Sequence, residues 1–234
     1  MQPLEAAGAT PASVNLCCAD ARRLGALVPP ASAHLVITSP PYNVGAPYAS
    51  YDDNLPEGEY WRLLADVFAA CAEALVDGGR IAVVCPAGVG RNPWRPFSPR
   101  VADLLGAAGF TLRGQIVWDK GATGSTAWGS FCLPTNPCLR DTTETILVAH
   151  RGSAALAAPR EVWLRDANGR LRSPWLDARL FMELAQDHWT VAPEHKSRVG
   201  HPAPFPVALV ERLIRFYGFP GCHVLDPFAG SGAT

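Results

Sequence analysis

Short apolar runs alternate with stretches of helical periodicity along most of this 234-residue chain. An apolar run of about four to eight residues between polar or turn-forming residues is typical of a buried strand. On this pattern we predict a last strand just before Asp226 and earlier strands at residues 14–20, 34–40, 80–85, 112–118 and 143–149.

Segments with helical signals separate these strands. In "GEYWRLLADVFAACAEALVDGG" the apolar residues recur at helical spacing, and Gly78 and Gly79 are expected to end the helix. Ser98 as the N-cap with Pro99 in the first turn predicts another helix, and an amphipathic helix is expected before the last strand. Strands that alternate with helices predict an α/β fold, with a parallel or mostly parallel sheet covered on both faces.

Two segments carry neither pattern. Residues 120–140 are rich in Gly, Ser, Thr and Pro, and residues 151–200 are irregular, with five arginines between Arg151 and Arg172. Segments without periodicity are poor candidates for the core and good candidates for binding loops. We therefore predict a recognition region within residues 120–198.

Charge is uneven along the chain, although the net formal charge is only −1. Residues 91–172 carry 11 Lys and Arg against 6 Asp and Glu, a net charge of +5, whereas residues 1–90 carry 4 against 9. A basic middle region suits a polyanion such as nucleic acid. A solvated, arginine-rich surface explains the same composition equally well, so both interpretations stay open.

Cysteine usage and hydropathy argue against several other classes of protein. The seven cysteines are scattered without a CxxC pair, so they predict neither a disulfide framework nor a zinc site. We expect a reduced, cytoplasmic protein without a metal. No apolar run approaches the roughly 20 residues of a membrane span, so we expect no membrane association.

The last residues, "HVLDPFAGSGAT", combine a strand, an acidic residue at its end and a glycine-rich turn that opens a helix. Gly230 and Gly232 let the backbone approach a ligand closely, and the free N–H groups of a helix start face that ligand. Many strand-to-helix turns use glycine only for packing. The combination of Asp226, a proline, Phe228 and the spaced glycines is more specific, and it predicts a ligand-binding turn.

A second motif, "TSPPYN", occupies residues 38–43. Two consecutive prolines fix φ and remove two donors, so they leave rigid carbonyl oxygens beside the flat ring of Tyr42. Acceptors next to a stacking ring suit the exocyclic amino group of a flipped base. Hydrogen bonds from that amine to Ser39 and Pro40 favour a pyramidal nitrogen whose lone pair can attack a methyl group. By itself, a Pro-Pro turn is more often structural.

Together the two motifs resemble the signatures of the S-adenosylmethionine-dependent DNA amino-methyltransferases, which modify cytosine N4 or adenine N6. The catalytic motif comes first and the glycine turn last, as in the circularly permuted beta class. The resemblance implies a Rossmann-like methyltransferase sheet, circularly permuted, with an irregular target-recognition insert. Residues 1–119 are then the catalytic half, 120–198 a strand plus the target-recognition region, and 199–234 the start of the cofactor-binding half.

The same resemblance implies roles for individual residues. The catalytic turn comprises Ser39, Pro40, Pro41 and Tyr42. The residues implied to hold S-adenosyl-L-methionine are Asp20, His201, Pro202, Phe205, Asp226, Phe228, Gly230 and Gly232. Arginine forks suit phosphates and guanine edges, so basic residues of the middle region are expected to contact DNA. These are Arg91, Arg95, Lys120, Arg165, Arg170 and Arg172.

The residue before Pro-Pro-Tyr bears on the target base. In this family a serine there is associated mainly with N4-cytosine methylation and an aspartate mainly with N6-adenine methylation. Ser39 therefore favours cytosine, and adenine is the alternative. A methyltransferase for a glutamine amide or an RNA base shares a Pro-Pro-Tyr turn, but the permuted order and the arginine-rich region argue against it. An inactive DNA-binding remnant is a further alternative.

The expected substrate is double-stranded DNA with a flipped target base, and the expected partners are a cognate restriction endonuclease and a second copy in a homodimer. The resemblance also implies a helix, a strand and a helix after the glycine turn, with an acidic residue that holds the ribose hydroxyls. The given sequence stops at Thr234. We therefore expect a C-terminal truncation and weak cofactor binding by this chain alone.

Overall fold

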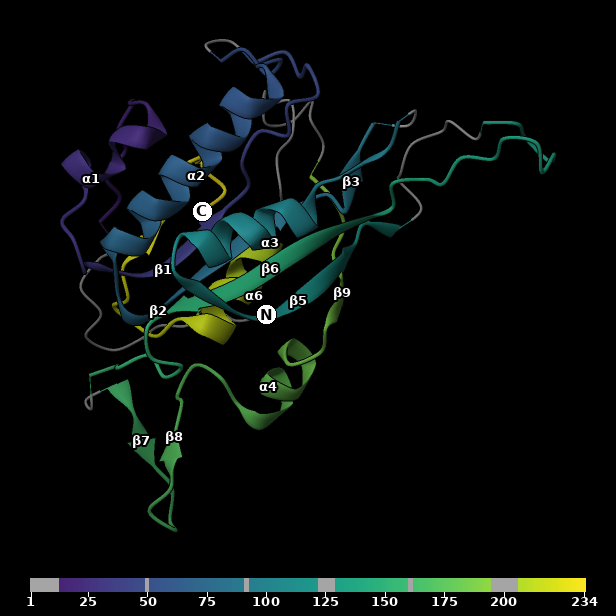
Figure 1. Ribbon diagram of the computed structural model, residues 1–234. Helices are drawn as coiled ribbons and strands as arrows, with labels where there is room; N and C mark the ends of the chain where they lie inside the picture. Colours follow the sequence, from purple (N-terminus) through teal and green to yellow (C-terminus); the bar gives the residue numbers. More distant parts are fainter. Residues whose placement is uncertain (1–12, 49–50, 91–92, 122–128, 160–161, 195–205) are drawn as a thin grey trace.

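A six-stranded sheet forms the centre of the molecule in the computed structural model (Figure 1). The structure describes residues 13–48, 51–90, 93–121, 129–159, 162–194 and 206–234. The strand order is β10-β1-β2-β6-β5-β9. In that order the strands span Val224–Leu225, Ala33–Thr38, Leu75–Cys85, Thr143–Arg151, Phe110–Asp119 and His188–Thr190.

Every strand of this sheet except β6 points the same way. β1 is parallel to β10 and β2, and β5 is parallel to β9, whereas β6 runs antiparallel to β2 and β5. The prediction of a mostly parallel sheet is confirmed. The carboxyl ends of β10, β1, β2 and β5 therefore meet the amino end of β6 at one edge, where open α/β sheets bind their ligands.

Helices cover both faces of the sheet, because side chains of each strand alternate between two cores. Val36 belongs to the core under α1, α2 and α3, and its neighbour Ile37 belongs to the core under α4 and α6. The helical segments are η1 (Ala21–Arg23), α1 (Leu24–Leu27), α2 (Glu57–Ala74), α3 (Ser98–Ala107), α4 (Ala178–Leu184) and α6 (Val207–Tyr217). This is a three-layer α/β architecture, as predicted.

The last strand of the chain lies beside the first, as the permuted order requires. Leu35 pairs with Val224. Immediately before this pair, the His223 N–H donates to Nδ1 of His34 at 3.0 Å. Burial and the neighbouring His223 lower the pKa of His34, which favours the neutral ring that can accept this bond. The two histidines, which have no evident partner in the sequence, therefore help to join β10 to β1.

The predicted strand at 14–20 is wrong. The structure has no strand there, and the side chains of Val14 and Leu16 are 78% and 83% exposed. A strand needs a neighbour for its backbone hydrogen bonds, and among the described residues no strand pairs with this segment. Asp20 instead caps η1, because its carboxylate accepts a hydrogen bond from the backbone N–H of Arg22.

Two predicted helix boundaries also differ from the structure. α2 ends at Ala74 and β2 begins at the next residue, so Gly78 lies within a strand instead of ending the helix. Gly78 has φ of +74°, and a Cβ there would collide with the carbonyl of Ala155, so close packing explains this glycine. At α3 the N-cap is Phe97, and Ser98 is already helical.

Two projections leave opposite ends of the sheet (Figure 1). Residues 129–142 extend from the edge where β6 begins, and the hairpin of β7 (Leu164–Arg165) and β8 (Leu171–Arg172) hangs beyond the end of β6. A third small hairpin, of β3 (Gly88–Val89) and β4 (Arg95–Pro96), follows β2. The stretch predicted to be irregular after residue 151 also contains α4 and β9. None of the described helices is long and apolar enough to cross a membrane.

Candidate active site

A hydrogen bond between two side chains far apart in sequence joins the two motifs. Thr38, the last residue of β1, is fully buried, and its hydroxyl donates to Oδ1 of Asp226 at 2.7 Å. Asp226 directly follows β10, which is paired with β1. Parallel strands that end at one edge bring these residues together. The catalytic turn and the glycine turn are therefore neighbours.

The carboxylate of Asp226 also shapes the glycine turn. It accepts hydrogen bonds from the Phe228 N–H at 3.0 Å and from the Thr234 hydroxyl at 2.7 Å. Burial raises the pKa of Asp226, although these hydrogen bonds and the bond from Thr38 counteract the shift. One carboxylate therefore fixes both ends of the turn.

The turn itself is open to a ligand. Gly230 and Gly232 have φ of +52° and +81°, conformations that favour glycine. No heavy atom outside the immediate chain lies within 4 Å of the position that a Cβ of Gly232 would take. Backbone N–H groups of such a turn can approach a carboxylate or a hydroxyl closely. These features fit the S-adenosyl-L-methionine that the sequence resemblance implies.

The Pro-Pro turn is held from below by α2. The Tyr60 hydroxyl, on the buried side of α2, donates to the Pro41 carbonyl at 2.6 Å. The Tyr42 ring packs against Phe97 edge-on, with ring centroids 5.4 Å apart. The hydrogen bond from Tyr60 thus holds the backbone of the turn, and the contact with Phe97 orients the Tyr42 ring.

The loop after Tyr42 wraps around a buried carboxylate. Asp53 is 2% exposed and accepts hydrogen bonds from the backbone N–H groups of Asn43, Val44 and Ala46 at 2.9–3.1 Å. The Asn43 side chain in turn donates to and accepts from the backbone of Leu55. Asn43 has φ of +55°, so these bonds hold a residue in a conformation it rarely adopts. Residues 43–55 therefore brace the catalytic turn.

A chain of polar contacts runs from the turn to the neighbouring strands. The Ser39 Oγ lies 3.0 Å from the Tyr42 hydroxyl, which donates to Oε2 of Glu144 at 3.1 Å. The other oxygen of Glu144 accepts from Nζ of Lys120 at 3.1 Å. Burial and the Glu144 carboxylate raise the pKa of Tyr42 well above its usual value. We call these four residues the Ser39–Lys120 chain.

A small pocket adjoins Tyr42. Its walls come from the catalytic turn, α2 and the β3–β4 hairpin. The residues that line it include Asn43, Glu57, Trp61, Arg95 and Phe97. Aromatic and charged groups around a stacking ring are suited to a planar, polar ligand.

The residues predicted from sequence fall into three groups. Ser39, Pro40, Pro41, Tyr42, Asp226, Phe228, Gly230 and Gly232 lie at the edge described above. Arg91, His201, Pro202 and Phe205 lie outside the described residues. Asp20 is bound to Arg22, whose side chain and backbone hydrogen bonds lower the pKa of Asp20 to about 2. Its contact with a cofactor stays a prediction.

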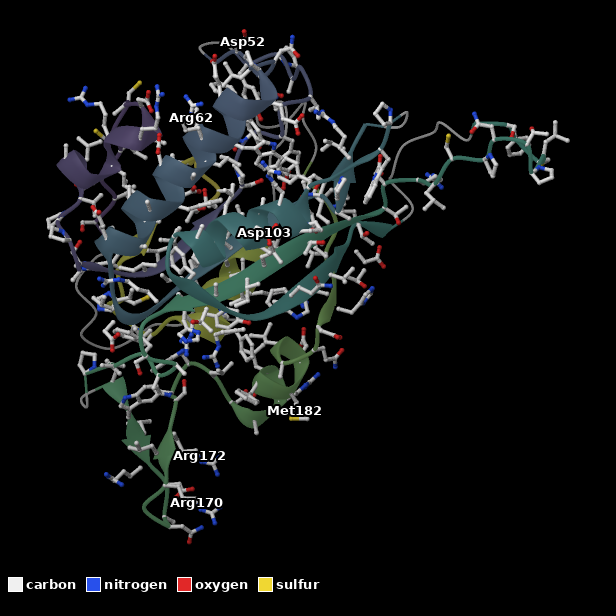
Figure 2. The ribbon with its side chains drawn as sticks, in the orientation of Figure 1. Asp52, Arg62, Asp103, Arg170, Arg172 and Met182 are labelled. Atoms are coloured by element: carbon white, nitrogen blue, oxygen red, sulfur yellow. The ribbon has the colours of Figure 1, made fainter. Side chains whose placement is uncertain are left out.

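The predicted DNA-contacting residues lie in different places. Arg95 lines the pocket beside Tyr42, and Lys120 binds Glu144. Arg170 and Arg172 lie on the β7–β8 hairpin, at the end of the molecule away from Asp52 and the loop after Tyr42 (Figure 2). Arg165, on the same hairpin, donates to the Gly169 carbonyl. The structure does not bring these three arginines to the catalytic turn, and their DNA contacts stay predictions.

Four residues that organise the site were not predicted from the sequence. Thr38 and Asp53 are polar but fully or almost fully buried, and Tyr60 and Glu144 bind the catalytic turn. The signal for Glu144 was a charged residue at the start of an otherwise apolar strand. Asp53 and Tyr60 gave no comparable signal, because their partners lie 10 and 19 residues away.

The chain matches a family of known proteins over most of its length. A DNA methylase family model, N6_N4_Mtase, matches residues 33–234. The type II methyltransferase M.MjaVI of Methanocaldococcus jannaschii is 27% identical over 173 residues, which are 74% of this chain and 83% of that protein. The DNA adenine methyltransferase YhdJ of Escherichia coli is 25% identical over 213 residues, 88% of this chain and 68% of that protein.

Solved structures show the same fold. The putative DNA modification methylase TTHA0409 of Thermus thermophilus, complexed with S-adenosyl-L-methionine, superposes with a TM-score of 0.64 at 28% identity, over 92% of this chain and 80% of that one. The cytosine-N4-specific PvuII DNA methyltransferase gives a TM-score of 0.62 at 21% identity, over 92% of this chain and 74% of that one. The second likeness supports the fold alone.

We predict that Asp53→Ala destabilises the protein by about 3 kcal/mol, because it leaves three part-buried backbone N–H groups without their acceptor. Urea denaturation measures the free energy of unfolding. The matched control is Asp52→Ala, which removes the exposed neighbouring carboxylate and its one backbone hydrogen bond, from the Asn54 N–H, and is expected to change that free energy by less than about 1 kcal/mol. Equal effects of the two substitutions would contradict a structural role for Asp53.

We predict that the melting temperature of Asp226→Asn, compared with that of the unmodified protein, rises as the pH increases above about 4 and levels off once the folded carboxyl has ionised. Burial raises the pKa of Asp226 in the folded state. The unfolded state therefore releases the proton first as pH rises, and the folded state loses stability until its own carboxyl ionises. Asparagine has no proton to release. Asp103→Asn on α3 controls for the loss of one exposed charge; a difference that narrows towards pH 7.5 would refute the assignment.

Proposed function

Because this chain belongs to the DNA methylase family of S-adenosylmethionine-dependent amino-methyltransferases, we propose that it methylates the exocyclic N4 of cytosine in DNA. The observation that carries this proposal is the joint between the Pro-Pro turn and the glycine turn through Thr38 and Asp226. That joint supports the proposal, because the groups proposed to accept the amine follow Thr38 and the glycine turn follows Asp226.

The catalytic turn supplies position and polarity to the reaction. The two N–H groups of the target amine donate to the Ser39 hydroxyl oxygen and the Pro40 carbonyl, which draws the nitrogen towards a pyramidal geometry. The base stacks on the Tyr42 ring, beside the pocket that Trp61 and Arg95 also line. Tyr60 and Asp53 keep the turn in place while the base binds.

The cofactor-binding groups of this chain are those of the glycine turn. Asp226 holds the turn in shape, and Gly230 and Gly232 present their backbone to the ligand. When bound, S-adenosyl-L-methionine supplies an electrophilic methyl group on a sulfonium. Phe228 packs on the core next to this turn.

Cytosine is proposed ahead of adenine because a neutral serine precedes Pro-Pro-Tyr. The serine hydroxyl is an acceptor for the amine without adding a second charge close to Glu144. N6-adenine remains the alternative, since the chain is similar to a DNA adenine methyltransferase over 88% of its length. Both bases present an exocyclic amine to the same turn.

Arg95 is the predicted DNA contact that the structure favours, because it lines the pocket beside Tyr42 on an exposed hairpin. The arginines of the β7–β8 hairpin can reach DNA only if the duplex extends past the opposite end of the sheet. A cognate endonuclease, a homodimer and a cytoplasmic location remain predictions from the sequence.

We predict N4-methylcytosine in plasmid DNA from cells that express the full-length gene product, measured by nucleoside mass spectrometry. Ser39→Ala is expected to lower the amount at least about tenfold, because the amine loses one acceptor. The Ser153→Ala variant, which changes an exposed serine beyond the carboxyl end of β6 and so at the opposite end of the sheet, serves as the matched control. N6-methyladenine in place of N4-methylcytosine would transfer the proposal to adenine.

A further inference from the structure

We propose that Glu144 is a positioning residue that makes the Ser39 hydroxyl a hydrogen-bond acceptor towards the target amine. Glu144 lies at the start of β6 and is 102 residues from Tyr42 in the sequence. Its carboxylate contacts the catalytic turn by accepting the hydrogen bond of the Tyr42 hydroxyl. This inference rests on the proposed amino-methyltransferase function and deepens it, since it concerns how the same turn receives its substrate.

Lys120 forms an ion pair with the carboxylate of Glu144. The ammonium group lies 3.1 Å from Oε1 of Glu144, and the side chains of Lys120 and Glu144 are only 18% and 16% exposed. An ion pair shielded from water in this way is less screened than a surface pair. An ionised carboxylate has no proton, so both of its oxygens can only accept hydrogen bonds.

The direction of the remaining hydrogen bonds then follows. Tyr42 has one hydroxyl proton, which it donates to Oε2 of Glu144. The contact of 3.0 Å between the Tyr42 hydroxyl and the Ser39 Oγ can therefore form only if Ser39 is the donor. With its proton committed to Tyr42, the Ser39 oxygen keeps two lone pairs. Towards any third partner Ser39 is an acceptor.

This polarity matters for the reaction of an amine. The target nitrogen needs its lone pair free to attack a methyl group, while its N–H groups need acceptors. A serine free to rotate can instead donate its own proton to that lone pair and occupy it. The Ser39–Lys120 chain excludes that arrangement before the substrate arrives, which is preorganisation of the kind that gives the largest catalytic effects.

Glu144→Gln tests the direction of the chain with almost no change in shape. Lys120 can only donate, so the glutamine carbonyl faces Lys120 and its amide NH₂ faces Tyr42. Tyr42 then accepts from the amide and donates to Ser39, and the Ser39 proton turns towards the substrate. The substitution thus reverses the hydrogen bonds without removing a side chain.

The experiment measures single-turnover methylation of plasmid DNA by the full-length protein, with the product nucleoside quantified by mass spectrometry. Glu144→Gln is expected to lower the rate by about tenfold to a hundredfold, while the DNA concentration that gives half the maximal single-turnover rate changes less than about twofold. In a Ser39→Ala background, Glu144→Gln is expected to have no further effect, because no hydroxyl remains to be oriented. Glu183→Gln, which neutralises one partner of a more exposed ion pair with Arg212 on the other face, is the control for the loss of a glutamate charge.

Two outcomes would overturn the proposal. One is a rate for Glu144→Gln within about twofold of the Glu183→Gln control. The other is an equal loss of rate from Glu144→Gln with and without Ser39, which would indicate a general structural effect. If the melting temperature shows that Glu144→Gln fails to fold, Tyr42→Phe is tested instead. It keeps the aromatic ring and removes the hydroxyl that links Ser39 to Glu144. Its rate is compared with and without Ser39 in the same way.

The same assay separates this proposal from the proposed function. The identity of the methylated nucleoside decides between cytosine and adenine. The ratio of rates between the variants decides the role of Glu144, whichever amine is methylated. N6-methyladenine together with the predicted ratios would therefore refute the cytosine assignment and support the hydrogen-bond chain.

Discussion

The hydrogen bond between Thr38 and Asp226 is the constraint on which the rest of the site depends. It joins two motifs that are 188 residues apart, and it forms because β1 and β10 are paired in parallel and end at the same edge. Thr38 is fully buried, so its hydroxyl cannot exchange this hydrogen bond for one to bulk water. The catalytic turn that follows Thr38 and the glycine turn that follows Asp226 therefore take up one fixed relation.

Around this joint, buried or half-buried carboxylates each hold a different part of the site. Asp226 accepts hydrogen bonds from the glycine turn, and Asp53 accepts them from the loop after Tyr42. Glu144 accepts the hydroxyl proton of Tyr42 and so sets the direction of that hydrogen bond. A carboxylate that accepts several bonds is costly to bury but holds its donors strongly. The result is a rigid set of acceptors that is already in place before the substrate arrives, and the fold provides it at the edge where the parallel strands end.

Sequence reasoning predicted the parts of the structure that periodicity and local motifs determine. The strand that ends at Thr38, the helix after Pro56 and the turn around Gly230 are each recognisable from their own residues. It failed where a partner decides the outcome. The apolar segment 14–20 could form a strand only beside a neighbouring strand. At Gly78 a glycine is required because the backbone of Ala155, distant in sequence, packs closely against it. Contacts such as those of Glu144 depend on which strands become neighbours, and no local pattern specifies that.

The most direct test of the central claim is the affinity of the full-length protein for S-adenosyl-L-methionine with and without the Thr38 hydroxyl. Thr38→Val keeps the shape of this buried side chain and removes its donor. Calorimetry is expected to show binding weakened by about tenfold, the value of a hydrogen bond to a charged group. An unchanged affinity would contradict the account, because the glycine turn would then keep its shape without its link to the catalytic turn.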